Sequence, residues 1–580
     1  MERWILKGGR YREYAERFAV NPLLAKVLAA RMQPDEVEDF LDKEKPISDP
    51  FLLPDMDAAV ERILAHRQRG SRIRIVGDYD VDGITATAIL YLGLRALGIE
   101  ADCRIPERIG EGYGFSEQIA EEVLRDDVNL VITCDNGIRE IERADFLKQH
   151  GVDLLITDHH EVEKDAEGRD VLPQAAAVVD PHRQDSRYPY PAICGAVTAY
   201  QLIRALRQRL DAGPADERLL GYAALGTICD VMPLTGENRR IVYKGLAALN
   251  REAGTGLRAL MRRSGTKEIS SYAAGYVLGP MLNAGGRLGS QNHYLDILIS
   301  EDADVCGELA EELFQLNRER QQMTEEGIQA GLAQLGKSNP EHRVKVLYLP
   351  ELHESIAGLV AGKIKELLYC PVFVVTRGET DLKGSGRSIP AYSMFEEMCK
   401  ASELFRKFGG HPLAAGFSLA ADPSQEEAVV QQMEQRLNAL SRLREEDCRP
   451  EVRIDAAVRM QDIPLSVIQS LERLEPYGMG NPRPLFAQKD VKLKRARWLG
   501  QNHRTLRLQL ASEGKSTEAL LFRTDALLAQ LSAEQKQNLE RGEYFATPLP
   551  LDICYQAEVD TYGGRDPKPK FIIQNLRAAQ

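Results

Sequence analysis

Three aspartates alternate along one short segment of the chain. Residues 77–83 read Gly-Asp-Tyr-Asp-Val-Asp-Gly, so that Asp78, Asp80 and Asp82 are each separated by a single residue. Carboxylates held this close raise one another's pKa and destabilise the fold unless a cation offsets their charge. Oxygen ligands of this kind suit Mg²⁺ or Mn²⁺, so the spacing indicates a divalent metal site.

Two other interpretations of this segment are a solvated turn and a calcium loop. An EF-hand loop also begins with alternating aspartates, but it requires a glutamate at its twelfth position. Counted from Asp78, that position is Ile89, which excludes the EF-hand. The solvated turn remains an alternative, because three acids by themselves do not distinguish it from a metal site.

Further acids and two imidazoles follow other short apolar runs. Asp135 stands in Thr-Cys-Asp-Asn-Gly, Asp158, His159 and His160 are consecutive, and Asp230 ends an apolar run. An Asp-Asn-Gly triplet is commonly only a turn, and a lone histidine is commonly structural. Jointly, however, these groups indicate one site at the carboxyl edges of several strands, where open α/β sheets bind ligands.

The elements that must position these groups alternate between strand and helix. Ile- and Val-rich runs at 73–76, 130–133, 154–157 and 177–179 predict strands, and 84–97 and 140–149 predict helices. Such alternation predicts a mostly parallel sheet with helices on both faces. Residues 195–300 are predicted to be mainly helical. Residues 301–336 lack proline and predict one helix about 50 Å long, enough to join two lobes.

The remaining segments predict a second α/β unit and a β-rich end. Strands are expected at 344–349 and 372–375, with helices at 356–368 and 426–444. From residue 451 onward the pattern is β-rich, with strands expected at 491–494, 505–510 and 571–574. Residues 1–50 predict a helical N-terminal elaboration that packs on the segment that follows it.

The overall charge is misleading about the partner. The 580 residues indicate three or four domains, and 87 acids against 74 bases give −13, which alone argues against nucleic acid. Between Asn481 and Leu510, however, eight Lys or Arg stand against the single acid Asp490, with Phe486 and Trp498 interleaved. Such a stretch is typical of a groove for single-stranded nucleic acid, with an ordinary solvated strand face as the alternative.

Composition also bears on the compartment. No apolar run approaches the ~18 residues of a membrane span, and residues 1–10 are too charged for a secretory signal peptide. The nine cysteines are odd in number and contain no C-x-x-C pair, which argues against a disulfide framework or a structural zinc site. We therefore expect a cytoplasmic protein without a membrane partner.

Taken in order, these motifs resemble those of the DHH phosphoesterase superfamily, and in particular its bacterial exonucleases specific for single-stranded DNA. The resemblance covers about residues 70–580 and rests first on residues 78–83, 135–137, 158–160 and 226–230. It also includes Pro-Glu-Arg-Ile-Gly-Glu-Gly-Tyr-Gly at 106–114, Asn-Ala-Gly-Gly-Arg-Leu at 283–288, Gly-Ser-Gly-Arg-Ser at 384–388, Gly-Gly-His-Pro-Leu-Ala-Ala-Gly at 409–416 and Tyr-Gly-Met-Gly-Asn-Pro-Arg-Pro at 477–484.

The resemblance implies an α/β fold with a C-terminal barrel. A parallel-sheet DHH domain would be joined by a long helix to a smaller α/β DHH-associated domain, followed by an oligonucleotide-binding (OB-type) β-barrel. The expected boundaries are 1–50 for the N-terminal elaboration, 51–300 for the DHH catalytic domain, 301–338 for the connector helix, 339–444 for the DHH-associated substrate-binding domain and 445–580 for the OB-like domain.

The resemblance also implies two Mn²⁺ or Mg²⁺ ions. The ligands carried over by position are Asp80, Asp82, Asp135, His159 and Asp230, with Asp135 bridging the two ions. Asp78 would lie in or beside this ligand shell. His160 would also lie there and would hydrogen-bond a non-bridging phosphate oxygen. Two such ions about 3.5–4 Å apart activate a shared water and stabilise charge on the phosphate and the leaving oxygen.

A second set of residues is expected to hold the substrate. The resemblance implies that Arg108, Ser385 and Arg387 form a pocket for a 5′-phosphate. It also implies that Arg287 and His411 contact phosphates near the scissile bond. For each arginine the alternative is a surface residue in an ion pair. The residues expected to contact DNA on the barrel are Lys492, Lys494 and Arg497.

The sequence departs from the family pattern at two positions. The small phosphatases of the superfamily have a histidine four residues before the position of Asp80, and here that position is Val76, so that Asp78 or water would complete the ligand shell. The family's Trp-His-x-Gly reads Leu352-His353-Glu-Ser here. His353 is retained as a substrate-binding candidate, whereas the missing Trp removes a stacking or packing surface.

We therefore expect a metal-dependent 5′→3′ exonuclease that degrades single-stranded DNA to 5′-mononucleotides in DNA repair and recombination. The alternatives are another DHH phosphoesterase acting on short oligonucleotides or cyclic dinucleotides, and a non-catalytic DHH scaffold. The first would lack the C-terminal barrel, and the second would have lost metal ligands. Family resemblance further implies a monomer that works with single-strand-binding protein and a RecQ-type helicase.

Overall fold

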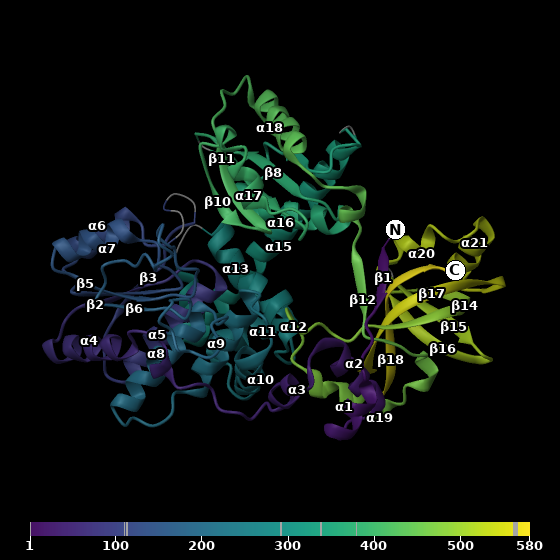
Figure 1. Ribbon diagram of the computed structural model, residues 1–580, viewed down its shortest axis with the longest axis horizontal. Helices are drawn as coiled ribbons and strands as arrows, with labels where there is room; N and C mark the ends of the chain where they lie inside the picture. Colours follow the sequence, from purple (N-terminus) through teal and green to yellow (C-terminus); the bar gives the residue numbers. More distant parts are fainter. Residues whose placement is uncertain are drawn as a thin grey trace. The chain divides into compact units, whose positions relative to one another are not determined.

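The chain folds into two compact units, each built from separate stretches of sequence. A computed structural model describes residues 2–108, 111, 114–289, 293–336, 339–378, 380–500, 502–560 and 566–579. The first unit contains residues 47–232 and 244–450, and the second contains residues 2–46, 233–243 and 451–580. Figure 1 shows the elements of each unit.

The first unit begins with a parallel five-stranded sheet. Its order is β3 (Asp102–Arg104), β2 (Ile73–Val76), β4 (Leu130–Cys134), β5 (Asp153–Thr157) and β6 (Ala177–Val179). Helices α6 (Glu117–Arg125) and α7 (Ile141–Gln149) lie on one face, and α4 (Met56–Arg69), α5 (Val81–Ala96) and α8 (Gly195–Arg209) lie on the other (Figure 1). The expected parallel sheet with helices on both faces is confirmed.

Burial explains why these strands read as short apolar runs. Every residue of β2 and β4 is buried, because helices cover both faces of the sheet. Helix α5 is buried from Val81 to Leu90 without interruption, since it packs between the sheet and helices α8 and α9 (Glu217–Cys229). A helix enclosed on this many sides needs no polar face.

A helical section follows the sheet. It contains α9, α11 (Gly254–Ser264), α12 (Ser271–Ala273), the π-helix η2 (Ala274–Leu278), α13 (Gly279–Leu288), α14 (Asp296–Ile299) and the 33-residue helix α15 (Ala303–Leu335). Helix α10 (Gly236–Arg251) begins in the second unit and ends in the first. Helix α15 packs on α11 and α13 at one part of its length and on α16 (Glu354–Leu368) at another, so it joins the two lobes of the first unit as expected.

The second lobe of the first unit is a mixed five-stranded sheet. Its order is β10 (Lys407–His411), β11 (Ala414–Leu419), β9 (Leu382–Arg387), β8 (Val372–Arg377) and β7 (Lys345–Tyr348). Only β7 and β8 run parallel. Helices α17 (Met394–Cys399) and α18 (Glu426–Leu440) contribute to the core on one face, and α16 to that on the other.

The second unit is centred on a closed β-barrel. Strands β14 (Phe486–Leu499), β15 (Thr505–Ser512), β16 (Lys515–Leu521), β18 (Lys568–Ala578) and β17 (Tyr544–Asp560) pair in that order, and β17 pairs back onto β14. Short strand β13 (Ala456–Ala457) extends β14 on one side, and α19 (Leu465–Ser470), α20 (Asp525–Leu528) and α21 (Ala533–Arg541) complete the domain. This confirms the expected OB-type barrel.

The N-terminal segment differs from its expected packing. Strand β1 (Arg3–Leu6) pairs in parallel with β12 (Glu451–Ile454), and α1 (Tyr11–Arg17), α2 (Pro22–Arg31) and α3 (Pro34–Leu41) share a core with the barrel. Its apolar side chains therefore pack on residues more than 400 positions away rather than on the segment that follows. Sequence proximity could not reveal this, because helices with an apolar face fit any complementary core.

Among the described residues, no helix is both long enough and apolar enough to cross a membrane.

Candidate metal centre and substrate cleft

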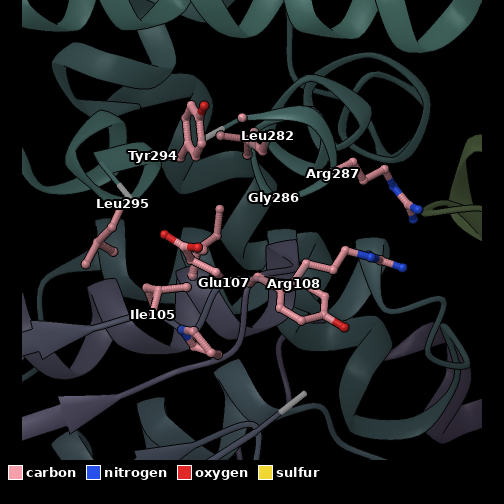
Figure 2. Close-up of a pocket in the computed structure, with 13 residues that line it drawn as sticks. Ile105, Glu107, Arg108, Leu282, Gly286, Arg287, Tyr294 and Leu295 are labelled. Atoms are coloured by element: carbon pink, nitrogen blue, oxygen red, sulfur yellow. The ribbon is translucent and has the colours of Figure 1, made fainter. Parts of the chain in front are cut away.

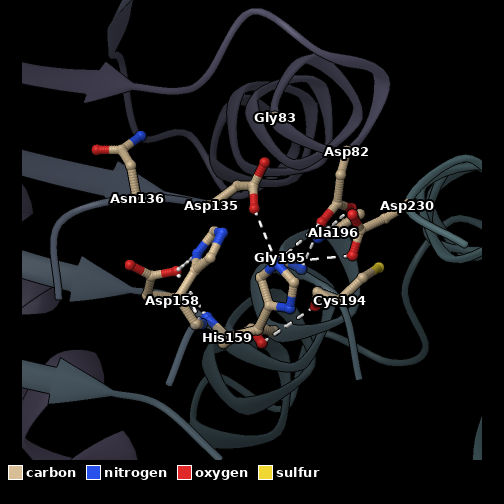
Figure 3. A network of polar contacts seen from close by, with 12 residues as sticks. Asp82, Gly83, Asp135, Asn136, Asp158, His159, Cys194, Gly195, Ala196 and Asp230 are labelled. Atoms are coloured by element: carbon tan, nitrogen blue, oxygen red, sulfur yellow. Dashed lines mark hydrogen bonds and ion pairs between the residues drawn. The ribbon is translucent and has the colours of Figure 1, made fainter. Parts of the chain in front are cut away.

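The strands of the first sheet bring most of the predicted site residues to one edge. Asp78 and Asp80 follow β2, Asp135 follows β4, and Asp158, His159 and His160 follow β5. The carboxyl ends of parallel strands meet at the same edge of a sheet, so these groups converge there. Figure 3 shows the carboxylate of Asp135 facing the ring of His159.

Asp230 reaches this space by a different route from the one expected. It does not end a strand, because it lies directly after Cys229, the last residue of helix α9. The run 219–227 reads as apolar because most of α9 is buried within the helical section of the unit, so sequence pattern alone did not separate helix from strand. Figure 3 shows Asp230 and Asp82 side by side.

Seven acidic and imidazole side chains form one cluster. Their ligand atoms lie within 4.8 Å of one another in three groups, which are Asp78, Asp80 and Asp135; Asp82, His159 and Asp230; and Asp135, His159 and His160. Asp135 and His159 each belong to two groups, and of these two only the carboxylate has two oxygens to offer, so the bridging role of Asp135 stays a prediction. Carboxylate and imidazole ligands suit Mn²⁺, and carboxylates suit Mg²⁺, so the residues present fit divalent ions of this kind.

The N-terminus of helix α8 holds the side chain of Asp82. The backbone amides of Gly195 and Ala196 donate to Oδ2 and Oδ1 of Asp82 at 2.7 and 3.0 Å. The N-terminal end of a helix carries partial positive charge, which stabilises an ionised carboxylate there. The side chain of Asp82 is therefore held in one place while its oxygens also face His159, with Nε2 at 3.6 Å from Oδ2.

Two glycines give the carboxylates room. A Cβ atom at Gly195 would lie 2.6 Å from Cβ of Asp135, and one at Gly226 would lie 2.5 Å from Oδ1 of Asp82. Both contacts are closer than real Cβ atoms show. Any side chain at either position would displace a carboxylate. Gly195 and Gly226 therefore belong to the site although neither supplies a ligand atom.

The two histidines occupy different environments. Nε2 of His159 lies 3.0 Å from Oδ1 of Asp135 and 3.8 Å from Oδ2 of Asp230, so it faces the carboxylates. His160 instead binds Asp158 through Nδ1, at 2.7 Å from Oδ1. Asp158 also accepts hydrogen bonds from the backbone amides of His159 and Ile138, which fixes the turn that presents both rings.

Burial and mutual repulsion set the pKa values of the cluster. Burial and neighbouring aspartates raise the pKa of Asp78 and Asp135 well above the usual range, and that of Asp230 to about 8. Oδ1 of Asp78 is buried and has no hydrogen-bond partner among the described residues. Bound cations would remove both penalties, since they favour the ionised carboxylates and supply the partner that Asp78 lacks.

Asp158 shows the opposite behaviour. Burial alone would raise its pKa, but the charge of His160 and the hydrogen bond to its ring prevail and lower the pKa of Asp158 to about 2. Burial opposes the charge on His160, yet Asp158 raises the pKa of that ring to about 9. Asp158 and His160 therefore form an internal ion pair at the rim of the cluster.

A cleft of about 620 Å³ lies in the first unit and is lined by predicted phosphate ligands. Arg108, Arg287, Ser385 and Arg387 all line it, as do Tyr79 and Gly358. Burial and the charges of Arg108, Arg320 and Arg387 lower the pKa of Arg287 to about 9. A guanidinium group that is both buried and close to other cations marks a place where an anion would be bound.

The arginines point toward the cleft from a well-packed base. The guanidinium of Arg108 stacks over the ring of Tyr79 at 4.9 Å. Nη1 of Arg287 donates to the carbonyl of Ser355 at 2.7 Å. Figure 2 shows the side chains of Arg108 and Arg287 extending in the same direction, away from Leu282, Tyr294 and Leu295, which line an adjoining cavity of about 70 Å³.

His353 and His411 lie near the cleft rather than among its lining residues. His353 caps helix α16, and its Nδ1 contacts Ser355 Oγ at 2.8 Å, while Ser355 lines the cleft. His411 is exposed at the end of β10 and pairs with Ala414, which in turn pairs with Arg387. Both contacts with substrate therefore stay predictions.

The predicted barrel residues belong to the second unit. Lys492 and Arg497 are exposed on β14, and Lys494 lies at a register shift between Leu493 and Arg495. Lys492 is paired with Asp490 at 2.7 Å. Part of the local positive charge is thus offset, and Lys494 and Arg497 have no ion-pair partner among the described residues.

The two departures from the family pattern have clear structural positions. Val76 is a buried core residue of β2, so its side chain packs against the helices and offers no ligand. Leu352 packs against α15, where a Cβ at Gly327 would lie 3.0 Å from its Cδ1. Of the motif at 106–114, residues 109, 110, 112 and 113 lie outside the described residues.

Sequence reasoning missed several groups that the structure adds. These are the α8 amides of Gly195 and Ala196, the cleft residues Tyr79, Ser355 and Lys383, and Arg320, whose charge acts on Arg287. The amides carry no sequence signal, since any residue supplies a backbone N–H. Tyr79 did carry a sequence signal, because it lies between two predicted metal ligands.

Comparison with known proteins places this fold and site in a class. Residues 72–227 match the family model described as the DHH family, N-terminal domain, and residues 341–439 match the DHHA1 domain. The chain therefore has the fold of a DHH-type phosphoesterase. Residues 454–575 match the RecJ OB domain. RecJ relatives that are 31–32% identical cover 82–98% of the chain. The chain belongs to the RecJ family.

Relatives and solved structures agree. The chain is 32% identical to the single-stranded-DNA-specific exonuclease RecJ of Bacillus subtilis, over 98% of this chain and 70% of that protein. It is 31% identical to the Escherichia coli protein of the same name, over 82% and 85%. The crystal structure of RecJ from Thermus thermophilus in complex with Mn²⁺ matches with a TM-score of 0.81 and 28% identity, over 100% of this chain and 80% of that one.

Proposed function

We propose that this chain is a 5′→3′ exonuclease that hydrolyses single-stranded DNA to 5′-mononucleotides, with two Mn²⁺ or Mg²⁺ ions bound by the cluster. The observation that carries the proposal is the complete set of seven acidic and imidazole groups beside a cleft lined by arginines. The names of its relatives, all single-stranded-DNA-specific exonucleases, support the substrate.

Each residue of the cluster has a task in this proposal. Asp78, Asp80, Asp82, Asp135, His159 and Asp230 would hold the ions, which when bound lower the pKa of a water molecule and stabilise charge on the phosphate. The α8 amides keep Asp82 in place. Asp158 orients the ring of His160 through Nδ1, so that this ring can bind a non-bridging phosphate oxygen.

The arginine cleft accounts for the polarity of digestion. Arg108, Arg287 and Arg387 lie together beside Tyr79, the residue between Asp78 and Asp80. A terminal phosphate carries more charge than an internal one and presents more acceptor oxygens, so clustered guanidinium groups favour it. A 5′-phosphate held there would place the first phosphodiester at the cluster, and hydrolysis would release one nucleotide at a time.

The barrel and the compartment complete the proposal. Lys494 and Arg497, with Lys492 and Trp498 beside them, would hold the strand on β14 of the OB domain. The nine cysteines, all within the described residues, are free thiols, which supports a reducing cytoplasm. A monomer in DNA repair and recombination, delivered by single-strand-binding protein and a RecQ-type helicase, follows from family resemblance alone.

The test is a nuclease assay with end-labelled DNA. In the presence of Mn²⁺, a 5′-phosphorylated single strand labelled at its 5′ end should release the label as mononucleotide at once. The same strand labelled at its 3′ end should shorten progressively. EDTA should stop both reactions, and blunt duplex should resist. A DHH phosphoesterase for short oligonucleotides or cyclic dinucleotides would leave the long single strand intact, and a scaffold would cut nothing.

The ligand assignment is tested by Asp82→Asn. The amide would place an NH₂ group against the N–H of Gly195 or Ala196, and it would remove one negative charge from the cluster. We expect turnover to fall roughly 100- to 1000-fold or more, with weaker Mn²⁺ binding by calorimetry. Asp422→Asn, at an exposed aspartate of the same unit, is the matched control and should leave both unchanged. Normal turnover in Asp82→Asn would overturn the assignment.

A further inference from the structure

Two tyrosines on the surface of the first unit form an exposed aromatic face. Tyr272 and Tyr276 are 67% and 74% exposed, and their rings stack on each other with centroids 5.1 Å apart and an interplanar angle of 24°. They are one helical turn apart on the segment formed by α12 and the π-helix η2. Rings this exposed lose little of their surface to the fold, so they contribute little to the core.

The segment that carries the two tyrosines packs on the helix that ends next to Asp230. The π-helix packs on the last turn of α9, where Cys229 Sγ contacts the carbonyl of Ala274 at 3.7 Å. A Cβ at Gly275 would lie 3.2 Å from Ile228. The next residue along α9 is Asp230, and Val231 beyond it is an exposed apolar side chain, at 58%. Single-turn π-helices within α-helices occur frequently at functional sites.

The same helical stretch continues to the arginine cleft. Segments α12, η2 and α13 are consecutive from Ser271 to Leu288, and Arg287 stands in the last turn. Tyr276 and Arg287 are eleven residues apart, about 16 Å along a helix. Between them, Asn283 Oδ1 accepts a hydrogen bond from the amide of Val81, in the segment of Asp80 and Asp82. One continuous helical stretch therefore carries the tyrosines, contacts the segment of the metal ligands through Asn283, and ends at the cleft.

Positive charge accompanies the tyrosines. Helix α11 packs against η2, and residues 258–267 contain four basic residues and no acid. Arg258, Arg262 and Lys267 are exposed and have no ion-pair partner among the residues that the structure describes. Exposed aromatic rings on one element and unpaired cations on the helix packed against it are a combination that suits single strands, because rings stack bases and cations attract phosphates.

We propose that Tyr272 and Tyr276 form a stacking site for bases of the single strand on the 3′ side of the bond that is cut. The inference rests on the proposed function. With the 5′-phosphate in the arginine cleft and the first phosphodiester at the metal cluster, the strand leaves the cluster on the side of Asp230 and Val231. Its second and later bases then meet the two tyrosines, and Arg258, Arg262 and Lys267 contact the phosphates between them.

The first test compares ring removal with ring retention. The double variant Tyr272→Ala/Tyr276→Ala should bind a 5′-phosphorylated 12-nucleotide single strand at least fivefold more weakly, measured by fluorescence anisotropy in EDTA, because a stacked base contributes about that factor or more. Tyr272→Phe/Tyr276→Phe keeps the rings and should bind within twofold of the unchanged chain. Leu367→Ala, at a 64% exposed residue on α16, is the control for loss of an exposed apolar side chain.

The second test locates the contact directly. Single strands carrying 5-iododeoxyuridine at one position each are irradiated with the unchanged chain in EDTA, and the crosslinked tryptic peptide is identified by mass spectrometry. We expect crosslinks to Tyr272 or Tyr276, located by fragmentation of the peptide 268–287, from the second to fourth nucleotides but not from the first. Crosslinks from every position to other peptides only would overturn the proposal.

The outcomes separate this inference from the proposed function. If the unchanged chain fails to degrade 5′-phosphorylated single strands with Mn²⁺, the proposed function itself fails. If it degrades them while the Ala double variant binds the 12-nucleotide strand as tightly as the Phe double variant, the stacking site alone is wrong. Equal weakening in both double variants also contradicts it, because Phe would stack as Tyr does.

Discussion

At the scale of single residues, the site depends on side chains held by several partners at once. Asp82 accepts from two amides of α8 and still presents oxygens to His159. Ser355 has a similar position in the cleft, because its carbonyl accepts from Arg287 and its hydroxyl contacts His353. Such residues position the groups that contact substrate, and their removal should lower the rate without unfolding the chain.

Ser355 gives the first prediction. Its backbone amide donates to Nδ1 of His353 at 3.4 Å, and its hydroxyl contacts the same nitrogen at 2.8 Å. Ser355→Ala removes the hydroxyl and should lower kcat/KM for 5′-phosphorylated single strands about two- to tenfold, the value of one hydrogen bond. Ser402→Ala, at an exposed serine of the same lobe, is the control, and an unchanged kcat/KM in Ser355→Ala would contradict the assignment.

Lys43 gives a prediction on pH. Burial and the charge of Arg239 lower the pKa of Lys43 to about 8, although its Nζ lies 4.5 Å from the ring of Tyr243. Between pH 8 and 10.5 the unfolded chain binds this proton and the folded chain does not, so stability rises with pH over that range. Below pH 8 the charged group destabilises the fold.

The measurement for Lys43 is denaturant unfolding at several pH values. Lys43→Met removes the buried charge, so it should be the more stable chain below pH 8. The difference should then shrink as the pH rises from 8 to 10.5. A difference that stays constant over this range would show that Lys43 titrates normally in the folded protein.

At the scale of elements, the site is built from the ends of strands and helices. Strands β2, β4 and β5 supply groups at their carboxyl ends, α8 supplies amides at its N-terminus, and α9 supplies Asp230 at its C-terminus. The packing of α5 against α8 and α9 sets the distances among these ends. Glycines at the contacts allow this close approach, and they are the positions where packing and function are coupled.

Gly195→Ala tests that coupling. The new methyl group would lie 2.6 Å from Cβ of Asp135 and must displace this residue, so we expect Mn²⁺ affinity to fall at least about tenfold, because a displaced carboxylate no longer ligates. The control is Gly307→Ala, in the exposed part of α15 with no atom within 4 Å of the new methyl group. It should stabilise the chain by about 0.5–1 kcal/mol. Calorimetric titration and thermal unfolding measure the two quantities.

At the scale of the whole molecule, the barrel core is assembled from distant parts of the chain. Residues 2–46 and 233–243 join residues 451–580 in one unit. Arg239 connects all three segments, because its buried guanidinium donates to the carbonyls of Phe40, Arg473 and Leu474. The three carbonyl partners satisfy this charge without a carboxylate.

Truncation tests this assembly. A chain that begins at Ile47 loses eight large apolar side chains that are buried in the barrel core, namely Tyr14, Val20, Leu23, Leu24, Val27, Leu28, Val37 and Phe40. At ~1.5 kcal/mol or more for each, the loss of ~12 kcal/mol approaches or exceeds the stability of an ordinary domain. We expect the barrel to lose its cooperative unfolding transition, while the cluster in the first unit still binds Mn²⁺. A barrel that unfolds cooperatively without residues 1–46 would contradict this.

Much of the site could be read from residue types and spacing. The alternating aspartates Asp78, Asp80 and Asp82 indicated a bound cation, because carboxylates held this close have few other stable uses. The positions of Asp158, His159 and His160 could be predicted because the strand before them is a recognisable apolar run. Asp230 was recognised as a member of the site, but its grouping with residues at strand ends conflicted with the helical prediction for residues 195–300, and the structure places it after helix α9. A buried helix and a buried strand are both apolar, and the pattern alone does not separate them.

What the sequence determined by itself was local chemistry and local periodicity: the acids and imidazoles, the strands that present them, the long helix α15 and the barrel. The tertiary structure decided which distant parts meet. It placed the α8 amides on Asp82, the N-terminal helices in the barrel core, and the segment of Tyr272 and Tyr276 against the last turn of α9. Amides and apolar faces are common to every segment, so their partners depend on packing in three dimensions, which no single stretch of sequence encodes.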